Sequence, residues 1–146
     1  MRVETSQTRR TVVSAIATGA LATVSGCGLL GRETLSTRYV VEEVDSPGSM
    51  LDEEADIEGG SHLADQFEIE EATEIRYTAA VLDGPNLNAF LLDNENATAL
   101  QAGEDVTAIE GSIALDTEIA RINGVELEAG TYTLVVDNGD VQPENA

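Results

Sequence analysis

Apolar and polar residues alternate in short runs along the second half of the chain. In the segment FEIE, Phe67 and Ile69 alternate with glutamates, and in TEIRYTAAV every second residue from Ile75 to Val81 is apolar. A period of two is typical of β-strands that place one face in a core and the other in water. We therefore expect each of these segments to be a half-buried strand.

Turn-forming residues divide the remaining sequence into further short segments. DGPN at 83–86 predicts a turn, and Asn123-Gly124 predicts a two-residue hairpin turn because both residues favour positive φ. We expect the segment DNENATALQAGED, at 93–105, to be a loop. The other expected strands are 38–44, 88–93, 106–109, 112–122 and 131–137, with Tyr132, Leu134 and Val136 of the last one pointing inward.

About seven short strands with turn signals between them, and without an amphipathic helix, predict an all-β fold. We expect an antiparallel, Greek-key-like β-sandwich over 38–138, with an open barrel as the alternative topology. The segment 45–61 combines Pro, paired Gly and many acids, so it is expected to be an acidic loop. We expect 139–146 to be a flexible tail.

The first 26 residues follow a different pattern. Arg9 and Arg10 precede an apolar run with Ala, Thr, Ser and Gly on every side, so the run has no helical stripe and is too short to span a bilayer. The run ends in small residues before the chain's one cysteine, Cys27. Positive charge, a short apolar run and small residues at its end predict a signal peptide over 1–26.

Composition limits the classes of function. The chain carries 28 acidic residues against 7 arginines and no lysine, which gives a net charge of −21. This charge repels phosphates, so binding to nucleic acid or to anionic lipid is disfavoured. An acidic surface without lysine is typical of halophilic proteins, because molar salt screens the self-repulsion. We therefore expect most carboxylates to form a salt-adapted surface.

The N-terminal motifs resemble those of haloarchaeal lipoproteins that are exported by the twin-arginine route. The segment TRRTVV resembles the twin-arginine signal, a receptor-read address for folded proteins. Val24, Ser25, Gly26 and Cys27 resemble a prokaryotic lipobox, whose cysteine becomes the new N-terminus and receives a lipid. The resemblance implies that 27–37 is a lipidated cysteine and tether. The domain would then lie at the outer face of the cell membrane, facing the extracellular medium.

A second resemblance concerns the C-terminal strand. LEAGTY at 127–132 resembles a tyrosine corner, in which the Tyr132 hydroxyl bonds the backbone a few residues upstream. Followed by LVVDN, the segment resembles the closing strand of bacterial pre-peptidase C-terminal domains, which are small secreted β-sandwiches appended to extracellular enzymes. The resemblance covers roughly 62–138. It bears on the fold more than on function, because the sequence shows no accompanying enzyme domain.

Candidate catalytic chemistry is sparse. A nucleophilic triad needs a general base, and the one histidine, His62, has no catalytic signature beside it, so we expect it to be a loop residue. Zinc and copper sites need several His or Cys ligands, and the chain has one of each, so neither metal is expected. Carboxylate pairs that hydrolyse glycosides lie in clefts lined with aromatic residues, which a small domain without Trp is poorly equipped to build. We therefore expect that the protein is not an enzyme.

Calcium is the one cation that the sequence leaves open, because hard cations take oxygen ligands from loops. Its candidate ligands are Asp83, Asp93, Asp137 and Asp140. None follows the EF-hand spacing, and turns use the same residue types, so no resident cofactor is expected. Asn96 begins the lone N-glycosylation sequon, Asn-Ala-Thr, and is a candidate for glycosylation in an exposed loop.

Together these observations favour a non-catalytic cell-surface lipoprotein. Its β-sandwich would bind an envelope protein or a glycan through loops or a strand edge. The alternative is a membrane-tethered accessory domain of an extracellular enzyme system, or a small hydrolase, which would need a pocket that gathers two carboxylates with raised pKa. A two-lobed solute receptor is disfavoured because the residues after Cys27 are too few for two typical domains.

Overall fold

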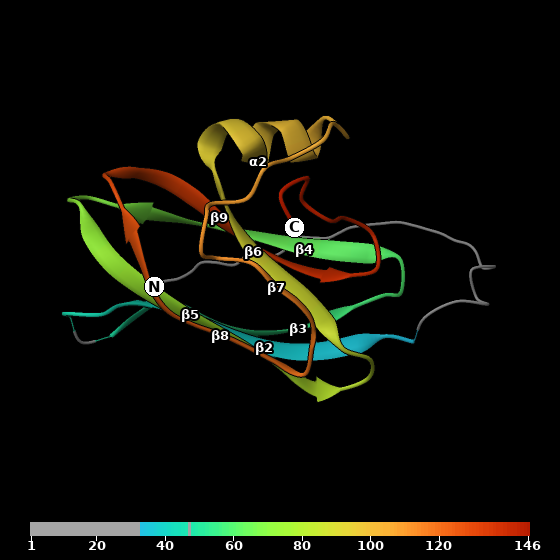
Figure 1. Ribbon diagram of the computed structural model, residues 1–146. Helices are drawn as coiled ribbons and strands as arrows, with labels where there is room; N and C mark the ends of the chain where they lie inside the picture. Colours follow the sequence, from blue (N-terminus) through green and yellow to red (C-terminus); the bar gives the residue numbers. More distant parts are fainter. Residues whose placement is uncertain (1–32, 47) are drawn as a thin grey trace. The chain divides into compact units, whose positions relative to one another are not determined.

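The computed structural model describes residues 33–46 and 48–146 (Figure 1). The expected signal peptide, with Arg9 and Arg10, and the expected lipobox that ends at Cys27 lie outside the described residues. Residues 33–146 form one compact unit, so the domain begins earlier than expected. No helix in the described part of the chain is long and apolar enough to cross a membrane.

Eight β-strands in the described residues form two antiparallel four-stranded sheets, which confirms the all-β sandwich with one strand more than expected. The first sheet has the order β3-β2-β5-β8, made of β2 (Leu35–Glu43), β3 (Ser49–Ile57), β5 (Thr73–Asp83) and β8 (Ile119–Leu127). The second has the order β4-β9-β6-β7, made of β4 (Ser61–Ile69), β6 (Leu87–Asp93), β7 (Ala114–Thr117) and β9 (Gly130–Asn138).

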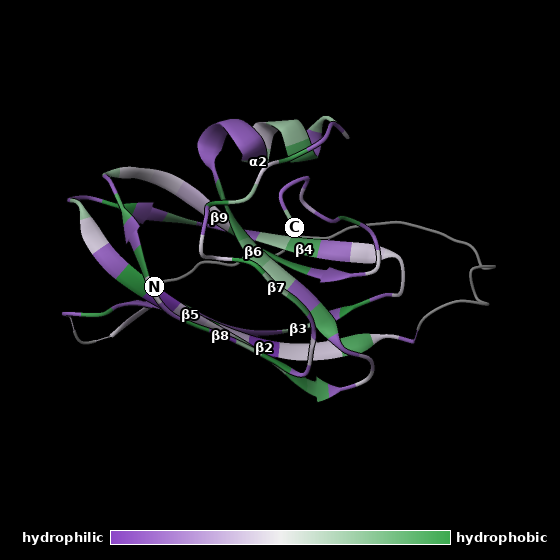
Figure 2. Cartoon of the chain, viewed as in Figure 1, coloured by the Kyte–Doolittle hydropathy of each residue, from purple (hydrophilic) through white to green (hydrophobic). Residues whose placement is uncertain are grey.

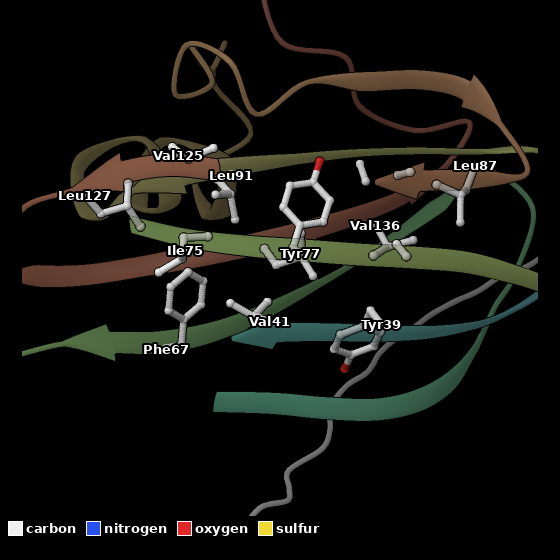
Figure 3. Close-up of a cluster of buried hydrophobic side chains, with 14 of the residues drawn as sticks. Tyr39, Val41, Phe67, Ile75, Tyr77, Leu87, Leu91, Val125, Leu127 and Val136 are labelled. Carbon is white, nitrogen blue, oxygen red and sulfur yellow. The ribbon is translucent and has the colours of Figure 1, made fainter. Parts of the chain in front are cut away.

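The main core lies between the two sheets, because alternate residues of each strand point inward. Ile75, Tyr77 and Ala79 of β5 are buried, as are Phe67 and Ile69 of β4, so the period-two pattern is confirmed. Figure 3 shows Tyr77 and Phe67 among the aliphatic side chains of the core. The Tyr77 hydroxyl donates a hydrogen bond to the carbonyl oxygen of Ser112, so the polar end of this side chain is satisfied inside the core.

The outer face of the second sheet is covered. The helix α2 (Asn94–Gln101) lies over β6 and β9 (Figure 1). A second apolar cluster forms beneath this cover, made of Phe90, Leu92, Val106, Ala108 and Val135, with Ala99, Leu100, Ile113 and Val141 packed against it. β6 is therefore buried on both faces, which explains its nearly continuous apolar sequence.

The expected acidic loop at 45–61 is wrong, because its central residues form β3. This strand pairs with β2 from Leu35↔Ile57 to Glu42↔Ser49. β3 is an outer strand of its sheet, and an outer strand tolerates acidic side chains, which also discourage pairing with other chains. The composition of this segment indicated a loop, but residues 49–57 form a strand because their backbone pairs with β2.

The expected loop at 93–105 contains α2 instead. Asp93 is the N-cap of this helix, and its carboxylate accepts a hydrogen bond of 2.9 Å from the Asn96 amide. An aspartate at the N-cap and Glu95 in the first turn are sequence features that favour a helix start here, and the expectation of a loop did not take them into account. The expected strand at 106–109 is also wrong, since this segment is irregular and its buried residues belong to the cover of the second sheet.

The expected strand at 112–122 is divided into β7 and the first part of β8. Glu118 separates the two strands, and Asp116 within β7 has a positive φ of 50°. The expected hairpin turn at Asn123-Gly124 is wrong, because β8 continues through both residues. Ile75 pairs with Val125 and Tyr77 with Ile122, so Asn123 and Gly124 form a β-bulge opposite β5.

The expectation of a flexible tail at 139–146 is contradicted by its hydrogen bonds. The Glu144 amide donates to the Val106 carbonyl oxygen over 2.8 Å. The Asn145 side chain bonds both backbone groups of Ala108, at 3.0 Å to the amide and 2.9 Å to the carbonyl oxygen. The C-terminal residues therefore belong to the cover of the second sheet.

Candidate binding face

The outer face of the first sheet, called here the open face, differs from that of the second sheet. α2 lies on the other side of the sandwich (Figure 1), and outward residues of β2 and β5 are exposed or half-buried. Residues paired across antiparallel strands share a face, so the register gives the rows of this surface. The two central rows, from β3 to β8, are Glu54-Arg38-Ala80-Ile119 and Asp52-Val40-Thr78-Arg121.

All three arginines in the described residues lie on the open face. Arg38 Nε and Nη2 each donate to the Asp52 carboxylate over 3.1 Å. Arg76 Nε donates to Glu42 Oε1 over 2.7 Å. Arg121 is exposed and has no ion pair with any residue that the structure describes.

The centre of the open face is apolar or small. Val40, Thr78 and Ala80 lie next to one another on β2 and β5 and are half-buried. An outward strand face of an antiparallel sheet is ordinarily polar, particularly in a chain this acidic. Small, half-buried residues therefore lie between charged ones at the centre of this face.

Two exposed aliphatic residues lie at one end of the open face. Leu82 is 55 % exposed and Ile119 is 50 % exposed, and they are the exposed large hydrophobic residues of the described chain. Ile119 pairs with Ala80, and Leu82 follows two residues later on the same face of β5. We call this pair the apolar corner. In Figure 2 the end of β5 is coloured as hydrophobic.

Three of the four candidate calcium ligands, Asp93, Asp137 and Asp140, contact other groups of the domain. Asp137 is buried, and its carboxylate accepts hydrogen bonds from the amides of Gly139, Asp140 and Val141 and from Asn88 Nδ2, at 2.8 to 3.0 Å. Asp93 caps α2, and Asp83 ends β5. No group of three or more His, Cys, Asp or Glu side chains in the described residues is arranged to hold a metal ion.

His62 belongs to β4 and not to a loop. Its Nδ1 lies 2.8 Å from Asp140 Oδ2. This pair connects the start of β4 to the turn that follows β9, which is a structural use of the imidazole.

Asn96 of the sequon is half-buried in the first turn of α2. Its Nδ2 donates to Asp93 Oδ1 over 3.0 Å, and its Oδ1 accepts from the Thr107 amide over 2.8 Å. Glycosylation would attach the sugar to Nδ2, the same atom that contacts Asp93. The expected exposed loop around this asparagine is therefore replaced by a helix that uses its side chain.

Two open hollows lie on the described surface, one of them lined by Gln66, Phe67, Glu68 and Thr131. Glu43, Glu70 and Glu71 meet in an open hollow with Ala72 and Thr73. No aromatic side chain lines this hollow, whereas sugar-binding clefts are built on aromatic surfaces. The open face is the surface with the more specific arrangement.

Comparison of the chain with family models, with curated proteins and with solved structures finds no match. The fold defines the class of the protein, a two-sheet β-sandwich with one covered and one open face. The resemblances to haloarchaeal lipoproteins and to pre-peptidase C-terminal domains rest on the sequence motifs alone and stay predictions.

Proposed function

We propose that this protein is a non-catalytic, lipid-anchored module of the cell surface that binds an envelope protein or a glycan through its open face. The asymmetry of the sandwich carries the proposal. α2, the irregular segment after it and the C-terminal residues cover one sheet, whereas the other sheet is open and bears every arginine of the described residues.

The distribution of charge makes the open face distinctive. Of the 28 acidic residues all but Glu4 lie within 33–146, against the arginines at 38, 76 and 121. Exposed ion pairs such as Arg38–Asp52 contribute little to stability, so stability alone does not explain why the cations gather on one surface. Arg121, without an ion pair among the described residues, suits a partner that presents a carboxylate or another planar acceptor.

Packing chemistry supports the same surface. A partner that covers Val40, Thr78 and Ala80 would bury small, rigid side chains and lose little conformational entropy. β3 is less suited to strand addition, because four acids lie at Asp52, Glu53, Glu54 and Asp56. We therefore place recognition on the face of the sheet and not on this edge.

The anchor is tested with a Cys27→Ser variant beside the wild type in a halophilic host. We expect the wild-type chain to be cleaved before Cys27, to carry the mass of a lipid and to sediment with membranes. The variant should do none of these, because only the thiol can accept the lipid. A wild-type chain that keeps residues 1–26, or that is released without a lipid, would overturn the anchor.

Recognition is tested with Arg121→Glu and with Gln101→Glu as the matched control. Gln101 is exposed at the end of α2, over the covered sheet, so the control introduces a glutamate elsewhere on the surface; the net charge changes by one there and by two at Arg121. A photoreactive group at Val40 should cross-link an envelope component in wild-type cells and in the control, and cross-linking should fall about tenfold or more in Arg121→Glu. Equal cross-linking in all three proteins contradicts the proposed binding face.

A further inference from the structure

We propose that the end of the sandwich at which β2 begins faces the bilayer, and that the apolar corner, Leu82 and Ile119, contacts the lipid interface there. This inference rests on the lipid anchor of the proposed function, and it adds the orientation of the domain and a second point of membrane contact.

The length of the tether limits how far this end can lie from the membrane. Five residues, 28–32, separate Cys27 from Glu33. A fully extended chain spans at most about 3.6 Å per residue, so Glu33 lies within about 20 Å of the lipidated cysteine. The end of the domain that holds Glu33 is therefore the end nearest to the bilayer.

Glu33 is fixed to the domain by a buried side chain. Asn138 is fully buried, and its Nδ2 donates hydrogen bonds of 2.9 Å to the carbonyl oxygens of Glu33 and of Ile57. The chain is thus held at the point where β3 ends and β9 ends. Glu33 is therefore a fixed point of the domain from which the distance to Cys27 is counted.

The apolar corner lies at this same end. Ser36 pairs with Asp83, and Gly84 approaches the backbone of Thr34, so β5 ends where β2 begins. The Val81 amide donates to the Glu118 carbonyl oxygen over 2.8 Å, which places the start of β8 beside them. Figure 1 shows the end of β5 and the start of β2 at one end of the sandwich.

A weak contact is sufficient for this orientation. Two half-exposed aliphatic side chains do not bind a free domain to a membrane, but a short tether raises the effective concentration to the millimolar range. A contact between the corner and the lipid with a dissociation constant in the millimolar range is then formed in a large fraction of the anchored molecules. The contact would set the orientation of the open face: the row of Val40 and Arg121, and then the pair Glu42–Arg76, lie successively farther along the strands from the row that holds Ile119.

Acidic residues at this end give the contact a specific salt dependence. Asp83, Glu118 and Asp116 lie near the corner and would repel anionic lipid. At molar salt the Debye length falls to about 3 Å, so the repulsion is screened while apolar burial remains. Contact through Leu82 and Ile119 should therefore strengthen with salt, whereas contact through an arginine and lipid phosphate would weaken.

The experiment measures which residues touch lipid in the anchored protein. The mature lipidated chain is reconstituted into phosphatidylcholine vesicles with brominated acyl chains, in molar KCl. A fluorophore is attached through Ile119→Cys, at the first residue of β8. In a second protein it is attached through Glu128→Cys, an exposed position that follows the last residue of β8 and so lies at the opposite end of that strand. We expect quenching at 119 to exceed quenching at 128 by about threefold or more, because bound apolar groups penetrate the interface.

Variants separate the corner from its surroundings. With the fluorophore at Asp83→Cys, quenching should be strong in the otherwise unchanged chain and should be lost when Leu82 and Ile119 are both replaced by Ser. Replacing Val40 and Thr78 by Ser, on the same face but farther from the tether, is the matched control and should leave quenching unchanged. Circular dichroism and denaturant unfolding confirm that each variant is folded.

The outcomes distinguish the inference from the anchor. Where mass measurement shows no lipid on Cys27, a fluorescent amino acid replaces the introduced cysteine, the Cys27 thiol is coupled to a maleimide phospholipid and the quenching is repeated, so the corner is tested even if the proposed anchor fails. Equal quenching at 119 and 128 in the anchored protein overturns the orientation. If the fluorophore is not quenched but its emission wavelength changes with the density of protein on the vesicle, the corner contacts a second copy of the chain. This result also overturns the inference.

Discussion

The Tyr132 hydroxyl donates a hydrogen bond of 2.8 Å to the carbonyl oxygen of Glu128, four residues upstream. The bond closes the corner at which the chain passes from β8 into β9, and the Tyr132 ring stacks on Phe67 with centroids 6.0 Å apart. The tyrosine corner predicted by the sequence is thereby confirmed.

Tyr132→Phe should lower the free energy of unfolding by about 1 kcal/mol, since a single neutral hydrogen bond is lost and the aromatic stack is kept. Tyr132→Ala should cost more, because it also removes the contact with Phe67. Denaturant unfolding in molar salt measures both. A Phe variant as unstable as the Ala variant would show that the hydroxyl, and not the ring, dominates.

Stability should depend on Tyr77 at alkaline pH. Burial raises the pKa of the Tyr77 phenol above its ordinary value near 10. Above the pKa of the unfolded chain, about 10, and below the raised pKa of the folded chain, the unfolded chain releases the proton while the folded chain keeps it. The free energy of unfolding therefore falls as pH rises through this range, by up to about 1.4 kcal/mol per pH unit. Below about pH 9 this group contributes no pH dependence.

Tyr77→Phe removes that titration and serves as the comparison. The difference in unfolding free energy between wild type and variant should be constant below about pH 9 and should shrink above about pH 10. Denaturant unfolding at a series of pH values measures it. Parallel curves through about pH 11 would contradict a phenol that stays protonated in the core.

Replacing the buried Asp137 should lower the free energy of unfolding strongly. Its buried carboxylate accepts four hydrogen bonds, three of them from the backbone amides of residues 139–141. Asp137→Ala leaves these donors without an acceptor, so we expect a loss of about 3 kcal/mol. Asp140→Ala, at the same turn but with an exposed side chain, should cost less than about 1 kcal/mol, and thermal or denaturant unfolding compares the two.

Gly84 is required for both its backbone angle and its contact. Its φ is 107°, and a Cβ there would clash with the Thr34 backbone. Gly60 has a φ of 80° with open space around it, so Gly60→Ala isolates the cost of the angle, about 1 kcal/mol. We expect Gly84→Ala to cost at least about 1 kcal/mol more, because backbone must move. An equal loss of unfolding free energy in the two variants would mean that the Thr34 backbone moves away from the new Cβ at no cost.

Asn96 should remain unmodified in the exported protein. Both ends of its side chain are hydrogen-bonded, to Asp93 and to the Thr107 amide, within a folded helical turn. A protein exported already folded would present no free amide to the glycosylation machinery. Intact mass of the mature chain, compared with Asn96→Gln, measures this, and a glycan mass lost only in the variant would contradict it.

The sequence by itself determined the class of fold. Alternation around Phe67, Ile75 and Tyr77 fixed which side chains enter the core, because a period of two reports burial on a strand directly. The corner at Tyr132 was also local, since donor and acceptor are four residues apart. The acidic composition and the motif at Cys27 come from the sequence alone as well.

Only the tertiary structure decided the features that depend on distant partners. β3 exists because β2 offers it a backbone, and Asn123-Gly124 became a bulge because β5 continues opposite it, against the preference of that dipeptide for a turn. The tail is held by Val106 and Ala108, more than thirty residues upstream. Arginines dispersed along the chain meet on one open face through strand register, which local periodicity does not encode.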